Sequence, residues 1–423
     1  MTRRPGALAL YALCAGLAEP LAPWLLSARV RRGKEDPGRQ GERLGRTDRP
    51  RPEGPLMWIH GVSVGESLSH LPLVERMARE RPDVVLLVTS GTRTSAELLS
   101  RRLPPGVIHQ YAPIDAPAAV GRFLDHWRPD LGVFVESELW PNLILSAAAR
   151  GVRLALIGAR ISERSARRWT RARSSAAALL ETFDLIWTQD APTRDWVEDL
   201  GIEVAGRLDL KRLAAPLPCD EAALAALRDV VQGRPVVVAA STHAGEETLV
   251  ATAAAGCDPR PLLVVVPRHP ERGAEAAQAL AAAGWRAGRR SLGATPTSEG
   301  DAYVADSLGE LGLFYRLGDV VVMGGSLIKG FSGHNPLEAA RLGSPVISGP
   351  HMDAFAETYA DLLAERAVLI AHDGPELGTA LSALVKEPSL ARALGERGRA
   401  FCERAPEGFE DLWASLLQRL PPP

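Results

Sequence analysis

The sequence has few cysteines, and no two of the four (Cys14, Cys219, Cys257 and Cys402) stand in a Cys-x-x-Cys spacing. Their scatter gives neither a disulfide framework nor a zinc site, and it is typical of a reducing compartment. A Walker A loop, an Asp-x-Asp pair and a His/Cys cluster with metal-ligand spacing are also absent from the sequence. Nothing in the sequence therefore requires a divalent metal, and we expect neither a metal nor a cofactor.

The chain lacks a large net charge, because 49 basic residues nearly balance 51 acidic ones. A formal net charge of −2 argues against a general nucleic-acid-binding protein. The contents of 46% hydrophobic and 24% charged residues are those of a globular protein. At 423 residues the chain is too long for one ordinary core, so two domains are expected.

An uninterrupted long hydrophobic run is missing too, although residues 6–18 form an apolar stretch. Glu19 and two prolines interrupt it before it reaches the roughly 20 apolar residues that a membrane-spanning helix needs. We expect residues 1–30 to form a helix that lies on the membrane surface, with the basic residues 29–32 against anionic lipid. A spanning anchor, a cleaved signal peptide and a plain hairpin are the alternatives.

Short apolar runs rich in β-branched residues recur along the chain and alternate with amphipathic stretches. This alternation is typical of βαβ units with a parallel sheet, and it occurs twice. We therefore expect an α/β fold with two domains, residues 31–212 and 234–423, joined by a linker and helix at 213–233. The expected strands are 56–60, 84–88, 131–135, 154–157 and 185–187 in the first domain and 235–239, 262–266, 302–304, 320–323 and 345–347 in the second.

Residues 407–419 carry large apolar side chains at helical spacing. The final helix that they predict either crosses back to the first domain or takes part in ordinary core packing, and the pattern is the same in both cases.

Polar clusters end several of the apolar runs, where α/β proteins hold ligands. Ser63, Gly65 and Glu66 occupy the strand-to-helix turn after the run 56–60, and Gly65 lets the backbone turn tightly. The helix start supplies a positive dipole end and free amides that keep a carboxylate ionised, as a general base must be. The alternative is an ordinary glutamate in the first turn of a helix.

Glu136 and Glu138 end the predicted strand 131–135. Side chains two residues apart on a strand point the same way, so the two carboxylates could hold hydroxyls or stabilise a developing cation. The alternative is a cap for the following helix.

Arg268 and His269 end the very apolar run 262–266 in the second domain. Cationic and donor side chains at that position suit an anionic group such as a phosphate, and a solvated loop is the alternative.

Asn335 and Pro336 fit the cap and first position of a helix whose free amides would form an anion site. Glu338, in the first turn, could accept hydrogen bonds from sugar hydroxyls, and a plain capped helix start is the alternative. Further candidate residues for this site are Ser241, Gly309, Glu310, Leu311, Gly325, Ser326, Gly333, His334 and Leu337.

Together these clusters resemble the signatures of the 3-deoxy-D-manno-octulosonic acid (Kdo) transferase family of lipopolysaccharide synthesis, in the family's order. The resemblance runs from about Arg31 to Tyr359. The matching segments are residues 33–35, 42–45, 60–67, 136–142, 159–165, 267–272 and 333–338.

The resemblance implies a GT-B fold, in which two Rossmann-like domains face a cleft, with the acceptor side first and the donor side second. It implies inverting, metal-independent transfer of Kdo from CMP-Kdo to a lipid A precursor at the cytoplasmic face of the inner membrane of a Gram-negative cell. Glu66 then matches the family's general base, and Glu136 matches a position that stabilises the transition state. The segments that match the CMP-binding parts are Arg268-His269, Gly309-Glu310-Leu311 and Asn335-Pro336-Leu337-Glu338.

One segment departs from the family's pattern, which places a lysine soon after a glycine. Here the stretch reads Gly206-Arg-Leu-Asp-Leu-Lys211, so Asp209 stands where the lysine is expected. Lys211 would lie on the same face if the segment were a strand, and we expect Lys211, or else Arg207, to take the lysine's place. A transferase that uses another sugar nucleotide, or a silent protein that binds a sugar nucleotide or lipid A, would share most of these features.

Overall fold

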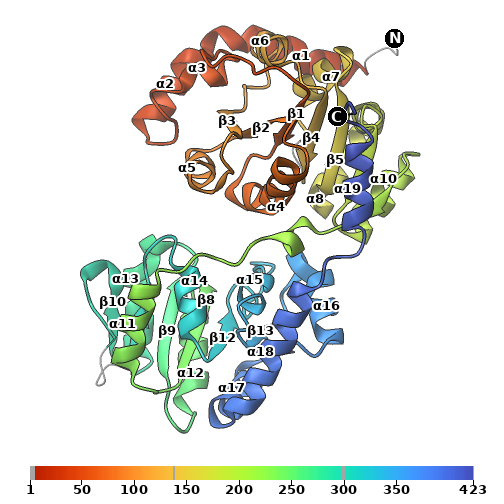
Figure 1. Ribbon diagram of the computed structural model, residues 1–423. Coiled ribbons are helices and arrows are strands. Elements are labelled where there is room, and N and C mark those ends of the chain that lie inside the picture. Colours follow the sequence, from red (N-terminus) through yellow and green to blue (C-terminus); the bar gives the residue numbers. More distant parts are fainter. Residues whose placement is uncertain (1–4, 137–138, 297–300, 423) are drawn as a thin grey trace. The chain divides into compact units, whose positions relative to one another are not determined.

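The computed structural model describes residues 5–136, 139–296 and 301–422 (Figure 1). It forms two compact units, each with its own sheet. Unit 1 comprises Met1–Ala215 with Ala405–Pro423, and unit 2 comprises Pro216–Arg404.

Unit 1 is built on a seven-stranded parallel sheet with the order β3-β2-β1-β4-β5-β6-β7. The order changes direction between β1 and β4, and ligands of open α/β sheets bind at the carboxyl ends of strands beside such a switch point. The five expected strands are present, and the sequence patterns missed the short edge strands β3 and β7. The strands are β1 (Leu56–His60), β2 (Val85–Ser90), β3 (Ile108–Tyr111), β4 (Leu131–Val135), β5 (Arg153–Ala159), β6 (Leu185–Thr188) and β7 (Gly206–Arg207).

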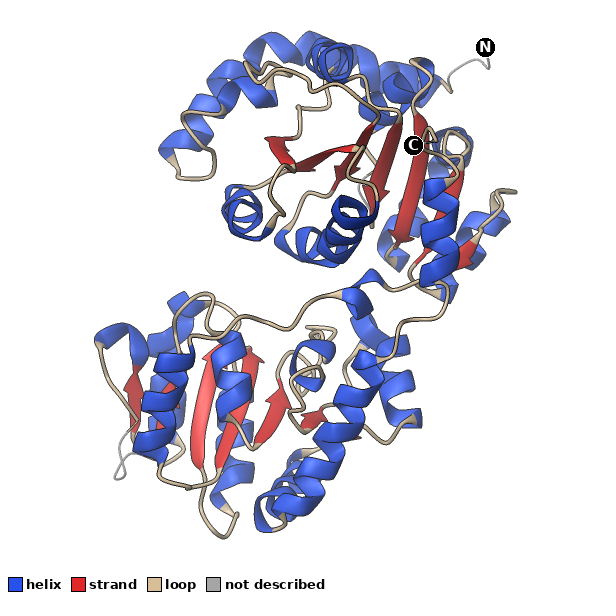
Figure 2. Cartoon of the chain, in the orientation of Figure 1, coloured by secondary structure: helices blue, strands red, loops and turns tan. Residues whose placement is uncertain are grey.

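Helices cover both faces of this sheet (Figure 2). Alternate side chains of β1 enter different cores: Met57 and Ile59 pack on one face, and Leu56 and Trp58 on the other. The helices are α1 (Gly6–Ala18), α2 (Ala22–Arg31), α3 (Gln40–Arg43), α4 (Val64–Glu80), α5 (Arg93–Arg102), α6 (Pro117–Trp127), α7 (Pro141–Ala149), α8 (Glu163–Trp169), α9 (Arg173–Leu180), α10 (Ala191–Asp199) and α19 (Phe409–Leu417).

Unit 2 repeats the plan with a seven-stranded parallel sheet of order β10-β11-β9-β8-β12-β13-β14, and its switch point lies between β8 and β12. Here the patterns missed the edge strands β10 and β14. The strands are β8 (Val236–Thr242), β9 (Leu262–Pro267), β10 (Ala287–Arg289), β11 (Ala302–Val304), β12 (Val320–Met323), β13 (Val346–Ser348) and β14 (Val368–Ile370). The helices are α11 (Glu221–Val231), α12 (Glu246–Ala255), α13 (Gly273–Ala282), α14 (Leu311–Leu317), α15 (Leu337–Ala340), α16 (Ala356–Ala364), α17 (Gly374–Lys386) and α18 (Pro388–Glu403).

Two helices make the division differ from the expected one. α11 buries Leu224 and Leu227 in the core of unit 2, so most of the expected linker 213–233 is part of that unit. α19 places Phe409, Leu412, Trp413 and Leu416 in the same hydrophobic core as β1. The predicted end of the second domain at residue 423 is therefore wrong, because unit 2 ends at Arg404. The last helix of the chain packs on the sheet of unit 1.

The N-terminal segment is helical without a break from Gly6 to Arg31, because a 3-10 turn (Glu19–Leu21) joins α1 to α2. The expectation that Glu19 and the prolines interrupt it is wrong, since both prolines stand in the first turn of a new helical element, where the missing N–H costs nothing. In the described part of the chain this is the one helix whose length and apolarity would allow it to cross a membrane, which by itself is weak evidence.

Polar contacts also fasten this segment along unit 1. The Tyr11 hydroxyl donates to Asp115 Oδ2 at 2.9 Å, and Glu19 accepts from the Ala118 amide and from Arg122, both at 3.0 Å.

Candidate active site

Glu66 lies in the turn between β1 and α4, at the switch point of unit 1. Ser63 is the N-cap of α4, and its Oγ accepts from the Glu66 amide at 3.2 Å. In return, Glu66 Oε2 accepts from the amides of Val62 at 2.5 Å and Ser63 at 3.2 Å. This is a capping box, so Glu66 does have the structural role of a first-turn glutamate that stabilises the start of α4. The Oε1 atom has no hydrogen bond to any described residue and remains available to a substrate.

Opposing effects act on the pKa of Glu66. Burial raises the pKa of Glu66, and the nearby charge of Glu136 raises it further, while the amides of Val62 and Ser63 act in the opposite direction. The amides at the helix start favour the ionised form, as expected, and burial acts more strongly, so the net direction of the pKa shift is upward. A raised pKa makes the carboxylate a stronger base once it is ionised.

Glu136 follows the last residue of β4 and has a positive φ of 59°. A non-glycine residue in this region costs about 1–3 kcal/mol and persists where surrounding contacts hold it. Two contacts do so: the Glu136 amide donates to the Ile157 carbonyl at 3.1 Å, and Lys211 Nζ lies 2.9 Å from Glu136 Oε1. Glu138, the expected partner of Glu136, lies outside the described residues.

Lys211 reaches Glu136 by a route that the sequence argument did not foresee. β7 ends at Arg207, so Lys211 is not on a strand and the argument from strand periodicity is wrong. Instead, Asp209 caps a 3-10 turn (Leu210–Leu213), and its Oδ1 accepts from the Lys211 amide at 2.9 Å. The residue at the position of the expected lysine thus orients the turn that brings Lys211 to Glu136.

Histidines gather beside the switch point of unit 2. His243 Nε2 lies 3.1 Å from His334 Nε2, and the His243 ring stacks on Phe331 with centroids 4.0 Å apart. His269, which follows β9, approaches the His243 ring edge-on, with the two ring centroids 6.2 Å apart. His243 and Phe331 were not among the predicted site residues, although the polar cluster after β8 contained the signal for His243.

Two charged groups accompany the histidines. Burial raises the pKa of Glu338 to about 7, against the opposing charges of Arg268 and Arg341. Burial, with the Arg268 charge second, lowers the pKa of His334 to about 4. Arg268 is exposed at the end of β9, and its guanidinium forms no hydrogen bond with the described residues. Unit 2 therefore presents a free cation, imidazole rings and a carboxyl group together, which suits a phosphate with a polar sugar or base.

The loops of this site are fixed by a buried glutamate, Glu246. Its Oε2 accepts from the amides of His243 at 2.9 Å and Gly325 at 2.7 Å, and its Oε1 accepts from the Leu327 amide at 3.0 Å. Ser326 also fixes these loops, because its Oγ accepts a hydrogen bond from the Gly349 amide at 2.8 Å. Gly325 and Ser326 thus shape the loop.

Other predicted residues of unit 2 have mainly structural surroundings. Asn335 Oδ1 accepts from the Leu337 amide at 3.1 Å, but the expected positions are shifted by one: Pro336 is the N-cap and the helix begins at Leu337. α15 is a single turn of four residues and offers little dipole. Glu310 is held by two hydrogen bonds from Arg290 and one from Ser307. Ser241, Gly309 and Gly333 have positive φ values, Pro336 directly precedes α15, and Leu311 begins α14. Throughout the described ranges, no three His, Cys, Asp or Glu side chains form a group that could hold a metal ion.

Comparisons with known proteins identify the family of this chain. The model of the family "3-Deoxy-D-manno-octulosonic-acid transferase (kdotransferase)" matches residues 38–211. The 3-deoxy-D-manno-octulosonic acid transferase of Rickettsia bellii is 32% identical over 402 residues, which cover 93% of this chain and 95% of the relative. That of Bordetella pertussis is 33% identical and covers 86% of each chain. This chain belongs to the Kdo transferase family.

Solved structures establish the architecture as well. Anabaena Alr3699/HepE in complex with UDP has a TM-score of 0.58 at 12% identity, covering 86% of this chain and 99% of that chain. At that identity the likeness shows the fold alone, a GT-B pair of Rossmann-like units. In this chain Glu136 pairs with Lys211, and the charge of Glu136 acts on Glu66, so the three residues form one group beside the switch point of unit 1.

Proposed function

We propose that this Kdo transferase moves Kdo from CMP-Kdo to a lipid A precursor, with inversion and without a metal. The observation that carries the proposal is the group at the switch point of unit 1: a buried carboxylate with one free oxygen, Glu66, beside the Glu136–Lys211 ion pair. The identity of the transferred sugar is inferred from membership of the Kdo transferase family. The donor and acceptor are those that the sequence motifs imply.

In the proposed reaction, Glu66 Oε1 takes the proton of an acceptor hydroxyl as that oxygen attacks the anomeric carbon of Kdo. The new carbon–oxygen bond forms as the bond to the CMP phosphate breaks, and the electron pair leaves with the phosphate. Attack from the side opposite the leaving group inverts the configuration. Glu136, held by Lys211, stabilises positive charge that develops on the sugar ring.

Unit 2 would bind the nucleotide. Arg268 would neutralise the departing phosphate, and His243, His334 and Glu338 would supply hydrogen-bonding groups for the rest of the donor. A monophosphate leaving group carries less charge than a diphosphate, so a single arginine with backbone amides is a sufficient counter-charge.

The proposed location is the cytoplasmic face of the inner membrane. Support comes from large apolar side chains that α1 and α2 expose and from the basic residues at the end of α2. The exposed apolar residues of this segment are Leu10, Tyr11, Leu13, Leu17, Leu21, Trp24 and Leu25.

Glu66→Gln tests the chemistry sharply, because glutamine can keep the capping box but cannot act as a base. We expect its kcat for Kdo transfer, read by mass spectrometry with EDTA present, to fall by about 10²–10⁴-fold. Glu75→Gln, on an exposed position of the same helix, is the matched control and should leave the rate unchanged. Full activity of Glu66→Gln would reduce Glu66 to its structural role, and loss of activity on adding EDTA would contradict metal independence.

A further inference from the structure

Unit 1 contains a cavity of about 560 Å³ between its N-terminal helices and the loops that follow β1, β2, β3 and β4. This volume lies within the roughly 300–1,000 Å³ typical of small-molecule sites. The helices contribute Ala15, Ala18, Ala22 and Leu26, and the opposite wall contributes Ile114 and Leu143. The cavity is therefore largely apolar and suits a hydrocarbon ligand.

A buried histidine, His60, is among the residues that line this space. His60 is 1% exposed, and its Nε2 has no hydrogen-bond partner among the described residues. Its other nitrogen, Nδ1, lies 2.9 Å from Thr89 Oγ1, which also accepts from Trp58 Nε1 at 2.8 Å. Burial lowers the pKa of His60 to about 3, so the ring is neutral at physiological pH. A buried nitrogen without a partner is costly.

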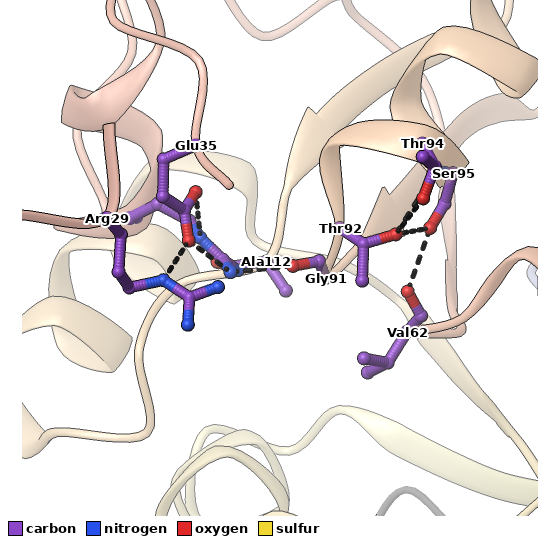
Figure 3. A network of polar contacts seen from close by, with 9 residues as sticks. Arg29, Glu35, Val62, Gly91, Thr92, Thr94, Ser95 and Ala112 are labelled. Atoms are coloured by element: carbon purple, nitrogen blue, oxygen red, sulfur yellow. Dashed lines mark hydrogen bonds and ion pairs between the residues drawn. The ribbon is translucent and has the colours of Figure 1, made fainter. Parts of the chain in front are cut away.

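Charged residues line another part of the cavity. Its two arginines differ in how many of their hydrogen-bond donors already have partners. Arg43 is fully engaged, because it donates to the carbonyls of Gly91 at 2.7 Å and Ala112 at 2.9 Å and also to Glu35. Arg29 donates only Nε to Glu35, at 2.8 Å, and its side chain is 47% exposed. Figure 3 shows Arg29 and Glu35 on one side of this region and Thr92 and Val62 on the other. The terminal nitrogens of Arg29 are thus available to an anionic or polar head group.

The cavity lies between the exposed apolar side chains of the N-terminal helices and the turn that contains Glu66. The helices that form its outer wall also expose Leu17, Leu21 and Trp24 by 60–74%. Val62, which lines the inner wall, donates its amide to Glu66. A chain that enters from the helices would therefore end beside the residue that holds the proposed base.

We propose that this cavity binds one fatty acyl chain of the acceptor glycolipid. The inference rests on the proposed function, since it names the part of the acceptor that unit 1 recognises. It accounts for a largely apolar cavity beside the catalytic turn, and it places the acceptor's sugar near Glu66.

The first test narrows the cavity with Ala18→Phe and compares it with Ala9→Phe, an exposed position on the same helix that does not line the cavity. Each variant and the wild type are assayed with a tetra-acylated lipid A precursor and with its fully deacylated form, which has lost both the ester-linked and the amide-linked chains. We expect Ala18→Phe to raise the KM for the acylated acceptor at least tenfold and to leave the KM for the deacylated acceptor and for CMP-Kdo unchanged. Ala9→Phe should match the wild type.

The outcomes separate the two proposals. A wild type that transfers Kdo with the same KM to both acceptors, or an Ala18→Phe variant equally impaired with both, would overturn the acyl-chain site and leave the transferase proposal intact. A folded wild type that transfers Kdo to neither acceptor would instead contradict the proposed function.

A second test needs no variant. A lipid A precursor and a phosphatidylethanolamine, each with a photoreactive group on an acyl chain, are crosslinked to the wild-type protein in vesicles, and the labelled peptides are identified. We expect the precursor to label peptides that contain residues 15–26 or 112–116, and unlabelled precursor to abolish that labelling. Labelling of these peptides by phosphatidylethanolamine that the precursor does not displace would overturn the proposal, because the cavity would then hold bulk membrane lipid.

Discussion

The Lys211–Glu136 ion pair permits the sharpest test of the geometry in unit 1. Lys211 Nζ and Glu136 Oε1 are 2.9 Å apart, and the two side chains are only 16% and 17% exposed. Exposed pairs contribute about 0.2–1 kcal/mol, whereas removal of one partner from a fully buried pair costs about 3–5 kcal/mol. This pair lies between the two limits. We therefore expect Lys211→Met to lower the free energy of unfolding by about 2 kcal/mol.

The same substitution should affect catalysis, because Glu136 is held at an unfavourable φ and loses one of its two contacts. We expect kcat to fall at least tenfold, which corresponds to about 1.4 kcal/mol in the activation barrier. Urea denaturation gives the stability, and the Kdo transfer assay gives kcat. Lys211→Arg keeps the positive charge but should not preserve kcat, since a guanidinium does not replace an ammonium at a tightly packed site.

A double-mutant cycle with Glu136→Gln decides whether the pair itself is responsible. Residues in direct contact couple by about 0.5–3 kcal/mol, so the two substitutions should be clearly non-additive. Arg194→Met is the matched control, because the side chains of its pair with Glu198 are 49% and 42% exposed, and it should cost no more than about 0.5 kcal/mol. Additive effects at Lys211 and Glu136, or a loss no larger than that of Arg194→Met, would refute the reasoning.

Three further predictions concern stability and the donor unit. The pKa of Glu338 is raised to about 7 from an ordinary value of 4.5, so the folded state binds the extra proton and stability should fall as pH rises from 4.5 to 7, by up to about 3 kcal/mol. Glu338→Gln should remove this slope in denaturation curves, and an unchanged slope would contradict the assignment. Trp413→Ala should destabilise the protein by about 3–5 kcal/mol in urea unfolding, because Trp413 is 4% exposed in the core of unit 1; a loss below 1 kcal/mol would mean that α19 is not needed there. Gly349→Ala should weaken CMP binding at least tenfold by calorimetry, since a Cβ there would lie 2.1 Å from the Ser326 carbonyl oxygen. Gly374→Ala, which meets nothing within 4 Å, is its control, and equal binding by both variants would separate that loop from the donor site.

Much of the fold could be predicted from local pattern. Strands such as 131–135, 302–304 and 320–323 have the predicted bounds, because a buried parallel strand needs a continuous apolar run that is visible in the sequence. The edge strands were missed for the same reason: Ile108–Tyr111 contains polar residues, and Gly206–Arg207 is too short to form a pattern. The Glu66 turn was also visible, since Ser63 and Glu66 have the spacing of a capping box.

The parts that only the tertiary structure decided all depend on distant segments. The sequence determined that Lys211 was available, but a 3-10 turn capped by Asp209, and not a strand, brings it to Glu136. It determined that residues 407–419 form an amphipathic helix, but the uncovered face of the first sheet decided where that helix packs. Periodicity determines which face of an element is apolar, whereas the partner that covers this face is chosen by packing between segments far apart in the chain.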